Sequence, residues 1–285
     1  MRAVLLALTD ELRRLRAAGV KTVSVSDESL GTLRRLVRAG EAGRRADPRV
    51  APEAAALPPP PEVTLPAGDK AARWQALRDR VLNHPVCRAQ VSPGKKVVFG
   101  VGSLDARIMF VGEAPGADEE ERGEPFVGPA GQLLTRMIKA MGLERGDVYI
   151  GNIMNWRPAA SRRPDGTQIG NREPTAEEMA FCLPFLTAQI EVVDPELVVA
   201  LGATAARGLL GPHSFRTLGD VRGRWHDWRG WPVRVTYHPS YLLRKEADGR
   251  DAAKRAKRTA WEDFLAVMER AGLAISPKQH DYFLR

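Results

Sequence analysis

The chain has 285 residues, 44% of them hydrophobic, which is enough apolar material for a folded core. Its net charge of +8 favours a polyanionic partner, nucleic acid before an anionic membrane, although an arginine-rich composition alone gives the same charge. The only two cysteines, Cys87 and Cys182, exclude both a disulfide scaffold and a four-thiolate metal site and indicate a reducing cytoplasm. No run approaches ~20 apolar residues, so the sequence predicts no membrane span.

The first 70 residues are predicted to lie outside the main domain. Residues 1–46 contain an amphipathic helical pattern, a short apolar run at 21–25 and a second helical pattern, which together predict a small basic α/β element. Residues 47–70 are rich in proline and alanine and are typical of an extended linker. We expect the main domain over residues 71–272 and a tail over 273–285.

Short apolar segments alternate with helical patterns throughout the main domain. This alternation predicts an α/β protein with a three-layer α/β/α fold around a mostly parallel, four-stranded sheet. Ligands of such sheets bind beyond the carboxyl ends of the strands. Candidate residues at or after these ends are Glu113, Asn152, Gly202 and His238. Strands are predicted at 106–114, 147–154, 196–202 and 233–238, and helices at 71–83, 129–143, 174–193, 203–210 and 252–271.

The segment GEAPGADEEERGEPFVGPAG (112–131) follows the first predicted strand. Its glycines let the backbone approach a ligand closely and present N–H groups in one direction. Glu113 stands at the strand end, and Phe126 lies in a rigid setting between Pro125 and Gly128. A tight turn, a solvated acidic run and a core phenylalanine would explain the parts separately, but the whole string is harder to attribute to chance.

Two further strand ends carry polar side chains. Asn152, in YIGNIMNWRP, has a donor and an acceptor to place. His238 opens the string HPSYLLR, in which Ser240 can cap a short helix. Either residue taken alone is explained as well or better by a structural role. Seven basic and three acidic residues lie between 238 and 258, so the His238 segment continues into a positively charged element.

Taken together, these strings resemble the uracil-DNA glycosylase superfamily, most closely its iron–sulfur family 4. The resemblance covers about residues 80–270. It rests on GEAPG, G-x-PFVG-x-AG, N-x-x-x-W-R-P, E-x-x-x-C-x-P, VVALG-x-x-A and HPSYLLR in this order. It implies an enzyme that flips uracil out of DNA and hydrolyses its N-glycosidic bond to leave an abasic site.

The resemblance implies catalytic roles for Glu113, Asn152 and His238. The histidine would lie near uracil O2 and stabilise the departing anion, and the asparagine would recognise the O4 and N3–H edge. The glutamate would orient the pocket or the attacking water, or stabilise the cationic sugar; whether it is a general base stays open.

Further residues are implied in binding rather than in the reaction. Phe126 would stack on the flipped base, and Glu119 would lie near uracil C5, although a solvated acidic run explains Glu119 better. The gap left in the DNA would be filled by the segment after the histidine. The remaining substrate-binding residues are Ala114 and Gly116, and the implied DNA-binding residues are Ser240, Leu242, Leu243 and Arg244.

The four cluster cysteines of family 4 are only half present. HPVC places His84 near the first position and Cys87 near the second, and Cys182 stands at the fourth. The third position is Trp156, whose indole offers only a donor. We therefore predict that Trp156 fills the cluster volume and that neither a 4Fe–4S cluster nor another metal is bound. Zinc held by His84, Cys87 and Cys182 is the alternative.

The sequence thus predicts a monofunctional uracil-DNA glycosylase of base excision repair that works without a cluster. No basic insertion with a histidine precedes PFVG, so no covalent adduct with DNA is expected. A glycosylase for hypoxanthine or xanthine and a catalytically inactive DNA-binding module are the alternatives. The expected partner is DNA containing uracil, bound by a monomer without membrane association in the bacterial cytoplasm or nucleoid.

Overall fold

The computed structural model describes residues 57–162 and 168–284. The α/β element expected at 1–46 and the first part of the expected linker lie outside the described residues. The residues from Leu57 onward form one compact unit. Among these residues no helix is long and apolar enough to cross a membrane.

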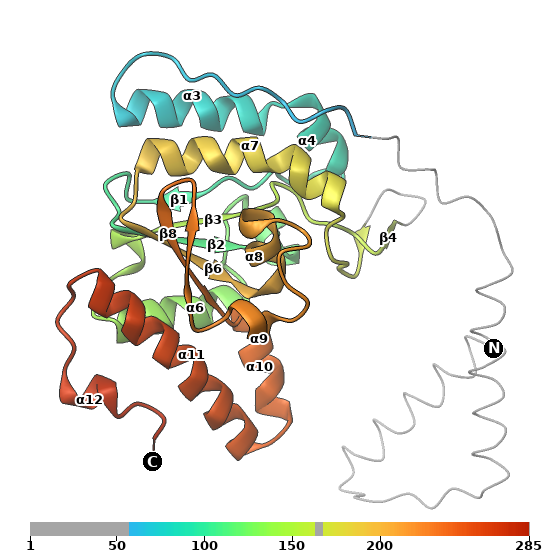
Figure 1. Cartoon of the computed structure of the whole chain (residues 1–285). Coiled ribbons are helices and arrows are strands. Elements are labelled where there is room, and N and C mark those ends of the chain that lie inside the picture. Colours follow the sequence, from blue (N-terminus) through green and yellow to red (C-terminus); the bar gives the residue numbers. More distant parts are fainter. Residues whose placement is uncertain (1–56, 163–167, 285) are drawn as a thin grey trace, which may run out of the picture. The chain divides into compact units, whose positions relative to one another are not determined.

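A six-stranded sheet with the order β1-β3-β2-β6-β8-β7 forms the centre of the molecule (Figure 1). Its four middle strands are parallel: β3 (Tyr149–Asn152), β2 (Ile108–Gly112), β6 (Leu197–Leu201) and β8 (Trp231–Thr236). They are the four predicted strands, and they confirm the α/β class. Two short antiparallel edge strands, β1 (Val101–Gly102) and β7 (Trp225–Trp228), extend the expected four-stranded sheet.

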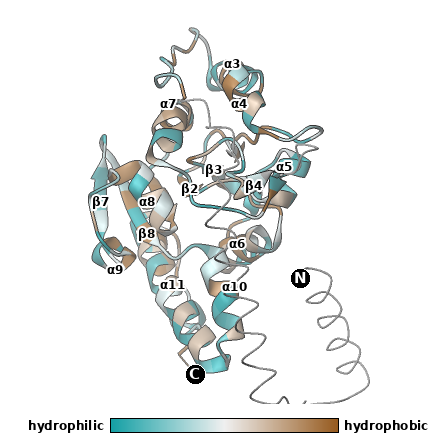
Figure 2. Ribbon diagram, turned by 90° about the vertical axis from the view of Figure 1, so that its right-hand side faces the viewer, coloured by the Kyte–Doolittle hydropathy of each residue, from teal (hydrophilic) through white to brown (hydrophobic). Residues whose placement is uncertain are grey.

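Helices cover both faces of the sheet because successive strand residues point to opposite sides. Met109 and Val111 pack in one buried cluster with residues of α3, α7 and α8, whereas Ile108 and Phe110 pack in another with residues of α6 and α11. Figures 1 and 2 show α3 and α7 on one side of the sheet and α6 and α11 on the other. The bounds of these helices are α3 (Lys70–Leu82), α6 (Pro129–Ala140), α7 (Ala176–Val193), α8 (Gly202–Leu210) and α11 (Arg250–Arg270).

The shorter elements lie mostly in the connections. The acidic run after the first predicted strand forms α5 (Ala117–Arg122). The helix expected after the histidine is α10 (Pro239–Ala247), and its N-cap is His238 rather than Ser240. The remaining short elements are α4 (Pro85–Gln90), the 3₁₀ turn η1 (Arg145–Asp147), β4 (Ser161–Arg162), β5 (Gln168–Ile169), α9 (Leu218–Val221) and α12 (Pro277–His280).

Both ends of the described unit pack against it. Residues 57–69 have no regular secondary structure, but Leu57, Val63 and Leu65 pack against the core cluster of α3 and α7. Part of the expected linker is therefore a strap rather than a free tether. In the tail, Gln279 accepts a hydrogen bond from the Trp261 indole at 2.6 Å and donates one to the Ala140 carbonyl at 2.8 Å.

The strand order creates a crevice at the carboxyl end of β2. The chain leaves β2 for β3 on one side, and β6 then pairs with β2 on the other side. Connections that depart in opposite directions from neighbouring parallel strands leave a gap beyond their carboxyl ends, where ligands of open α/β sheets bind. Glu113 follows β2 at this position.

Candidate active site

A cavity of about 700 Å³ opens at the carboxyl ends of the four parallel strands. Each of these strands contributes to its lining, either with its last residue or with the segment that follows it. The sequence-predicted residues that line it are Glu113, Ala114, Gly116, Glu119, Phe126, Asn152, His238, Ser240 and Arg244. The structure therefore brings together, in one cavity, residues that lie up to 131 positions apart, from Glu113 to Arg244.

Gly112 lets two of these side chains approach the end of β2. A Cβ atom at this position would collide with the Phe126 ring and with the Asn152 side-chain oxygen. Phe126 adopts a positive φ of 54°, a conformation that is rare outside glycine and that is often found at functional sites. Its ring is 7% exposed, and its centroid lies 5.7 Å from that of His238. One aromatic face is thus held against the cavity beside the histidine.

Asn152 is the last residue of β3 and is 7% exposed. Its Oδ1 atom is buried and has no hydrogen-bond partner among the described residues. A buried amide oxygen without a partner is unfavourable by roughly 1–3 kcal/mol. The position therefore suits a ligand that brings its own N–H donor to the cavity.

His238 caps α10, and its hydrogen bonds determine which ring nitrogen carries the proton. The backbone N–H of Ser240 donates to Nδ1 at 3.1 Å, and the Ser240 hydroxyl lies 2.8 Å from the same atom. Nδ1 must therefore accept, which leaves the proton of the neutral ring on Nε2. Burial, with a smaller contribution from the positive charge of Arg244, lowers the pKa of His238 to about 4. The ring is a neutral Nε2–H donor at physiological pH.

Close packing by Gly202 and a hydrogen bond from Ser240 hold His238 in place. Gly202 has a φ of 91°, and a Cβ at this position would lie 2.9 Å from the Cβ of His238. Within α10, the Arg244 guanidinium donates to the Ser240 hydroxyl at 3.2 Å and so helps to hold this partner of the imidazole. The start of α8 thus packs against His238, while Ser240 in the first turn of α10 donates to its ring.

Glu113 follows β2 and lies half-buried in the cavity. Burial raises its pKa, while a hydrogen bond from Thr204 lowers it. The negative charge of Glu173 adds to the increase, and the positive charge of Arg244 opposes it. Thr204 lies in the first turn of α8 and is 6% exposed, so it holds the carboxylate from a buried position.

Glu119 fastens two loops of the cavity together. Its carboxylate accepts hydrogen bonds from the backbone N–H groups of Gly116 at 3.0 Å, Val127 at 3.0 Å and Gly128 at 2.9 Å. The first belongs to the turn after β2, and the other two belong to the turn that carries Phe126. The backbone N–H of Gly116, a residue implied in substrate binding, therefore donates to Glu119.

We expect Glu119→Gln to destabilise the fold by about 1–3 kcal/mol, because one of the three backbone N–H groups would then face an amide NH₂ instead of an acceptor. Urea unfolding measures this loss. Glu121→Gln is the matched control, because Glu121 lies on the same short helix but is exposed and forms an ion pair with Lys95, and it should change stability little. Equal stability of the two variants would show that the Glu119 contacts do not hold the loops.

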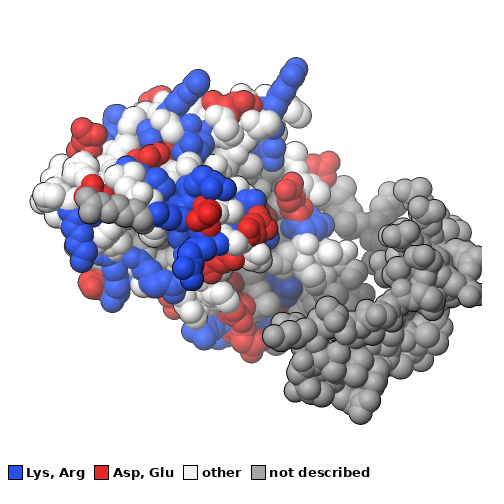
Figure 3. Space-filling view, turned by 90° about the horizontal axis from the view of Figure 1, so that it is seen from below, with Lys and Arg blue, Asp and Glu red and all other residues white. Residues whose placement is uncertain are grey.

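The segment after His238 divides into a buried part and an exposed part. Leu242 is 1% exposed and packs with Leu133 and Ala260, so it fixes α10 to the domain and does not reach the surface where DNA was expected. Leu243 is half-buried and Arg244 is exposed at the cavity. Lys and Arg gather, with some acidic side chains among them, on the face seen from below, where α10 and α11 lie in Figure 1 (Figure 3).

The positions at which family 4 would hold its iron–sulfur cluster form an apolar patch here rather than a set of metal ligands. Trp156 is 1% exposed, and its ring centroid lies 6.0 Å from that of Phe181. The His84 ring packs edge-on against Phe181 at 5.5 Å. Cys87 and Cys182 are free and fully buried, and burial raises the pKa of Cys87 to about 12. The described residues contain no group of three or more His, Cys, Asp or Glu able to hold a metal ion.

Two thiols do not fit a 4Fe–4S cluster, which takes four thiolates. Metal ligation also requires deprotonated thiols, and both cysteines have raised pKa values because they are buried. A large indole and two phenylalanines occupy this region instead. The residues present therefore do not suit the cluster expected for family 4.

Some cavity residues were not singled out from the sequence. Thr204, Tyr237 and Tyr241 line the cavity together with Asn171, Arg172 and Glu173. Thr204 lies two residues after the predicted strand 196–202, so its place in VVALG-x-T was the available signal. The 171–173 segment gave none, because it comes from a long irregular connection whose path cannot be read from periodicity.

The fold and the cavity agree with a comparison to known families. The chain matches the Uracil DNA glycosylase superfamily over residues 99–265, more than half of its length, and it belongs to this superfamily. It is 46% identical over 153 residues to the Type-4 uracil-DNA glycosylase of Thermotoga maritima, which covers 53% of this chain and 74% of the relative. It is 43% identical over 159 residues to the Type-4 uracil-DNA glycosylase of Pyrobaculum aerophilum, which covers 54% of this chain and 76% of the relative.

Proposed function

We propose that this protein is a monofunctional uracil-DNA glycosylase that flips uracil out of DNA and hydrolyses its N-glycosidic bond. One observation carries the proposal: Glu113, Phe126, Asn152 and His238 line a single cavity at the carboxyl ends of four parallel strands. Type-4 relatives support the same substrate. A cavity of about 700 Å³ has room for a base together with its sugar and a water molecule.

In this reaction the bond between the sugar carbon and the base nitrogen breaks, and its electron pair leaves with the base. The negative charge collects on uracil O2, where the Nε2–H group of His238 donates a hydrogen bond. A neutral imidazole with its proton fixed on Nε2 needs no reorganisation to do so, which is the condition for strong transition-state stabilisation. The Phe126 ring stacks on the base from one side.

Glu113 acts on the sugar rather than on the departing base. The sugar becomes cationic as the base departs, and a nearby carboxylate stabilises this charge and orients the water that attacks the sugar carbon. Burial raises the pKa of Glu113, and the hydrogen bond from Thr204 and the positive charge of Arg244 oppose this increase. The water adds its oxygen to the sugar, and its proton leaves to a base or to solvent, which yields the abasic site.

Asn152 supplies the choice of base. Its unpaired Oδ1 accepts the N3–H group of uracil, and its amide group donates to O4. Cytosine presents an acceptor at N3 and a donor at its 4-amino group, so both contacts would be mismatched. A site built on such hydrogen bonds rejects a mismatched base by roughly 10⁴-fold.

We further propose that the protein works without an iron–sulfur cluster, and that Trp156 and its aromatic neighbours replace the cluster as the support for the loop after β3. A fully buried tryptophan contributes large apolar area in a fixed position. This loop begins directly after Asn152, so its support also holds the cavity.

We expect Trp156→Ala to destabilise the fold by about 3–5 kcal/mol, because it leaves a cavity at a fully buried site. Trp231→Ala is the control, because Trp231 is only partly buried at the start of β8 and its loss should cost less. Trp156→Phe should recover much of the stability. If Trp156→Ala unfolds at the same urea concentration as the parent, the indole does not replace a structural centre.

The proposal is tested with single-lesion duplexes that carry uracil, hypoxanthine or xanthine at one labelled site, followed by alkali. Scission at uracil alone supports the proposed activity. Scission at hypoxanthine or xanthine would identify a glycosylase for another deaminated base. Binding to the duplexes without scission would identify an inactive DNA-binding module.

The setting of the activity is proposed on the same grounds. A repair enzyme of this class acts on chromosomal DNA, so we place it in the bacterial cytoplasm or nucleoid as a monomer. Its basic surface would bind phosphates, and affinity for DNA should fall as the salt concentration rises.

A further inference from the structure

We propose that Arg222 is a positioning residue that holds Tyr237, and through it His238, in the cavity. This inference rests on the proposed function, because it assigns to Arg222 a part in setting the rate of uracil excision. It also makes a claim about the position of Tyr237 that can be measured without any activity.

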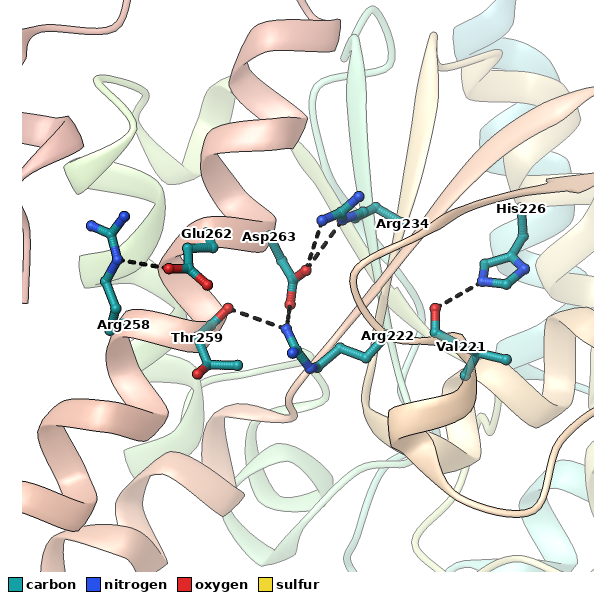
Figure 4. A network of polar contacts seen from close by, with 8 residues as sticks. All are labelled: Val221, Arg222, His226, Arg234, Arg258, Thr259, Glu262 and Asp263. Carbon is teal, nitrogen blue, oxygen red and sulfur yellow. Dashed lines mark hydrogen bonds and ion pairs between the residues drawn. The ribbon is translucent and has the colours of Figure 1, made fainter.

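Arg222 is held by a buried carboxylate, that of Asp263 on α11 (Figure 4). The Asp263 side chain is 1% exposed and accepts hydrogen bonds from two arginines. Arg234 on β8 donates to Oδ1 from Nη2 at 2.9 Å and from Nε at 3.2 Å. Arg222, which follows α9, donates to Oδ2 from Nη1 at 3.0 Å and to the Thr259 carbonyl at 3.4 Å. One carboxylate therefore joins α11, β8 and the turn after α9.

The Arg222 guanidinium reaches from this carboxylate to the cavity wall. Its Cζ atom lies 5.2 Å from the centroid of the Tyr237 ring. The Tyr237 ring in turn lies 4.6 Å from that of Tyr241, with an angle of 30° between the planes. Both tyrosines line the cavity, and Tyr237 directly precedes His238.

Tyr237 needs such support because the sheet ends before it. The last pair between β6 and β8 joins Leu201 to Thr236, so the strand pairing does not fix the next residue. The chain then turns at once into α10, whose N-cap is His238. A ring clamped between Arg222 and Tyr241 fixes the direction in which the chain leaves the strand, and this direction places the imidazole.

The planar shape of the guanidinium is what makes the contact possible. Arginine can bond a carboxylate with one edge and lie against an aromatic ring with its face, whereas lysine offers only a compact charge. A misplacement of about 1 Å at a catalytic group can lower a rate by roughly 100-fold. We therefore expect loss of Arg222 to affect the chemical step rather than DNA binding.

Single-turnover excision of uracil tests the kinetic claim. We expect Arg222→Met to lower the maximal rate by roughly 10–100-fold, with half-saturation by DNA and its salt dependence nearly unchanged, and Arg222→Lys to recover only part of the loss. In a Tyr237→Leu background, Arg222→Met should cause little further loss. Arg229→Met is the matched control, because Arg229 lies 5.2 Å from the Trp228 ring on the β7–β8 hairpin and should keep the parent rate.

A second measurement separates this inference from the proposed function. The chain has only four tyrosines, so fluorotyrosine labelling gives a simple ¹⁹F NMR spectrum. In Arg222→Met the Tyr237 and Tyr241 signals should shift, with Tyr149 and Tyr282 unchanged, whether or not uracil is the substrate. If the parent excises no uracil, the proposed function fails while this spectrum still tests the inference. Unmoved Tyr237 and Tyr241 signals would overturn it, as would weaker DNA binding at an unchanged maximal rate.

Discussion

Replacing His238 by alanine should lower the maximal rate of uracil excision by about 10²–10³-fold, because the departing base loses a hydrogen bond that is aimed at its developing charge. Binding of a duplex with uracil should change much less, since the imidazole contributes most in the transition state. Single-turnover kinetics with saturating enzyme measures the rate directly. His213→Ala is the control, because this histidine is exposed and does not line the cavity.

The lowered pKa of His238 adds a test by pH. The unfolded imidazole takes up a proton near its ordinary pKa of 6.5, whereas the folded one does so only at about 4. Stability contributed by the neutral ring is therefore present above pH 6.5 and is lost as the pH falls toward 4, by on the order of 3 kcal/mol. The stability of His238→Ala should lack this part of the pH dependence. Identical pH dependence in parent and variant, or a rate within two- to threefold of the parent, would contradict the assigned role.

Replacing Asn152 by alanine should lower uracil excision by roughly 10²–10⁴-fold, because both hydrogen bonds to the pyrimidine edge are lost together. The variant should also lose selectivity. The parent should prefer uracil over cytosine by roughly 10⁴-fold, and this ratio should narrow in the variant, because the amide that mismatches cytosine is gone. Initial rates on duplexes that differ only in the one base give both numbers.

Stability provides the check on this variant. The Asn152 Oδ1 atom is buried without a partner, so removing the amide should leave the fold as stable as before or make it slightly more stable. Asn83→Ala is the control, since its amide donates to the Asp79 carbonyl at the end of α3. Lost stability with unchanged selectivity would mean that Asn152 is a structural residue rather than the one that recognises the base.

Much of the fold could be predicted because the parallel strands are buried on both faces. IMFVG, YIGN and LVVAL read as short apolar runs, and their ends indicated where Glu113, Asn152 and Gly202 would lie. The edge strands β1 and β7 could not be predicted in the same way. β1 is two residues long, and WHDW in β7 lacks a continuous apolar run.

Other features depend on contacts between distant segments. A solvated acidic run was the alternative explanation for Glu119, but its carboxylate turns inward to three backbone N–H groups, and no periodicity signals such a contact. Leu242 was expected at the DNA surface, but α10 turns it toward Leu133 and Ala260. The pairing of Asp263 with Arg222 and Arg234 joins residues on three separate elements, and their charges alone did not distinguish them from exposed ones.

The central claim is that the cavity excises uracil while an aromatic patch stands in place of an iron–sulfur cluster. The most direct measurement is single-turnover excision of uracil and elemental iron analysis on one and the same preparation, purified without exposure to air. We predict rapid scission at uracil by a colourless protein with well under one iron atom per chain. A brown protein with about four iron atoms per chain, or an iron-free protein that leaves uracil in place, would contradict the account.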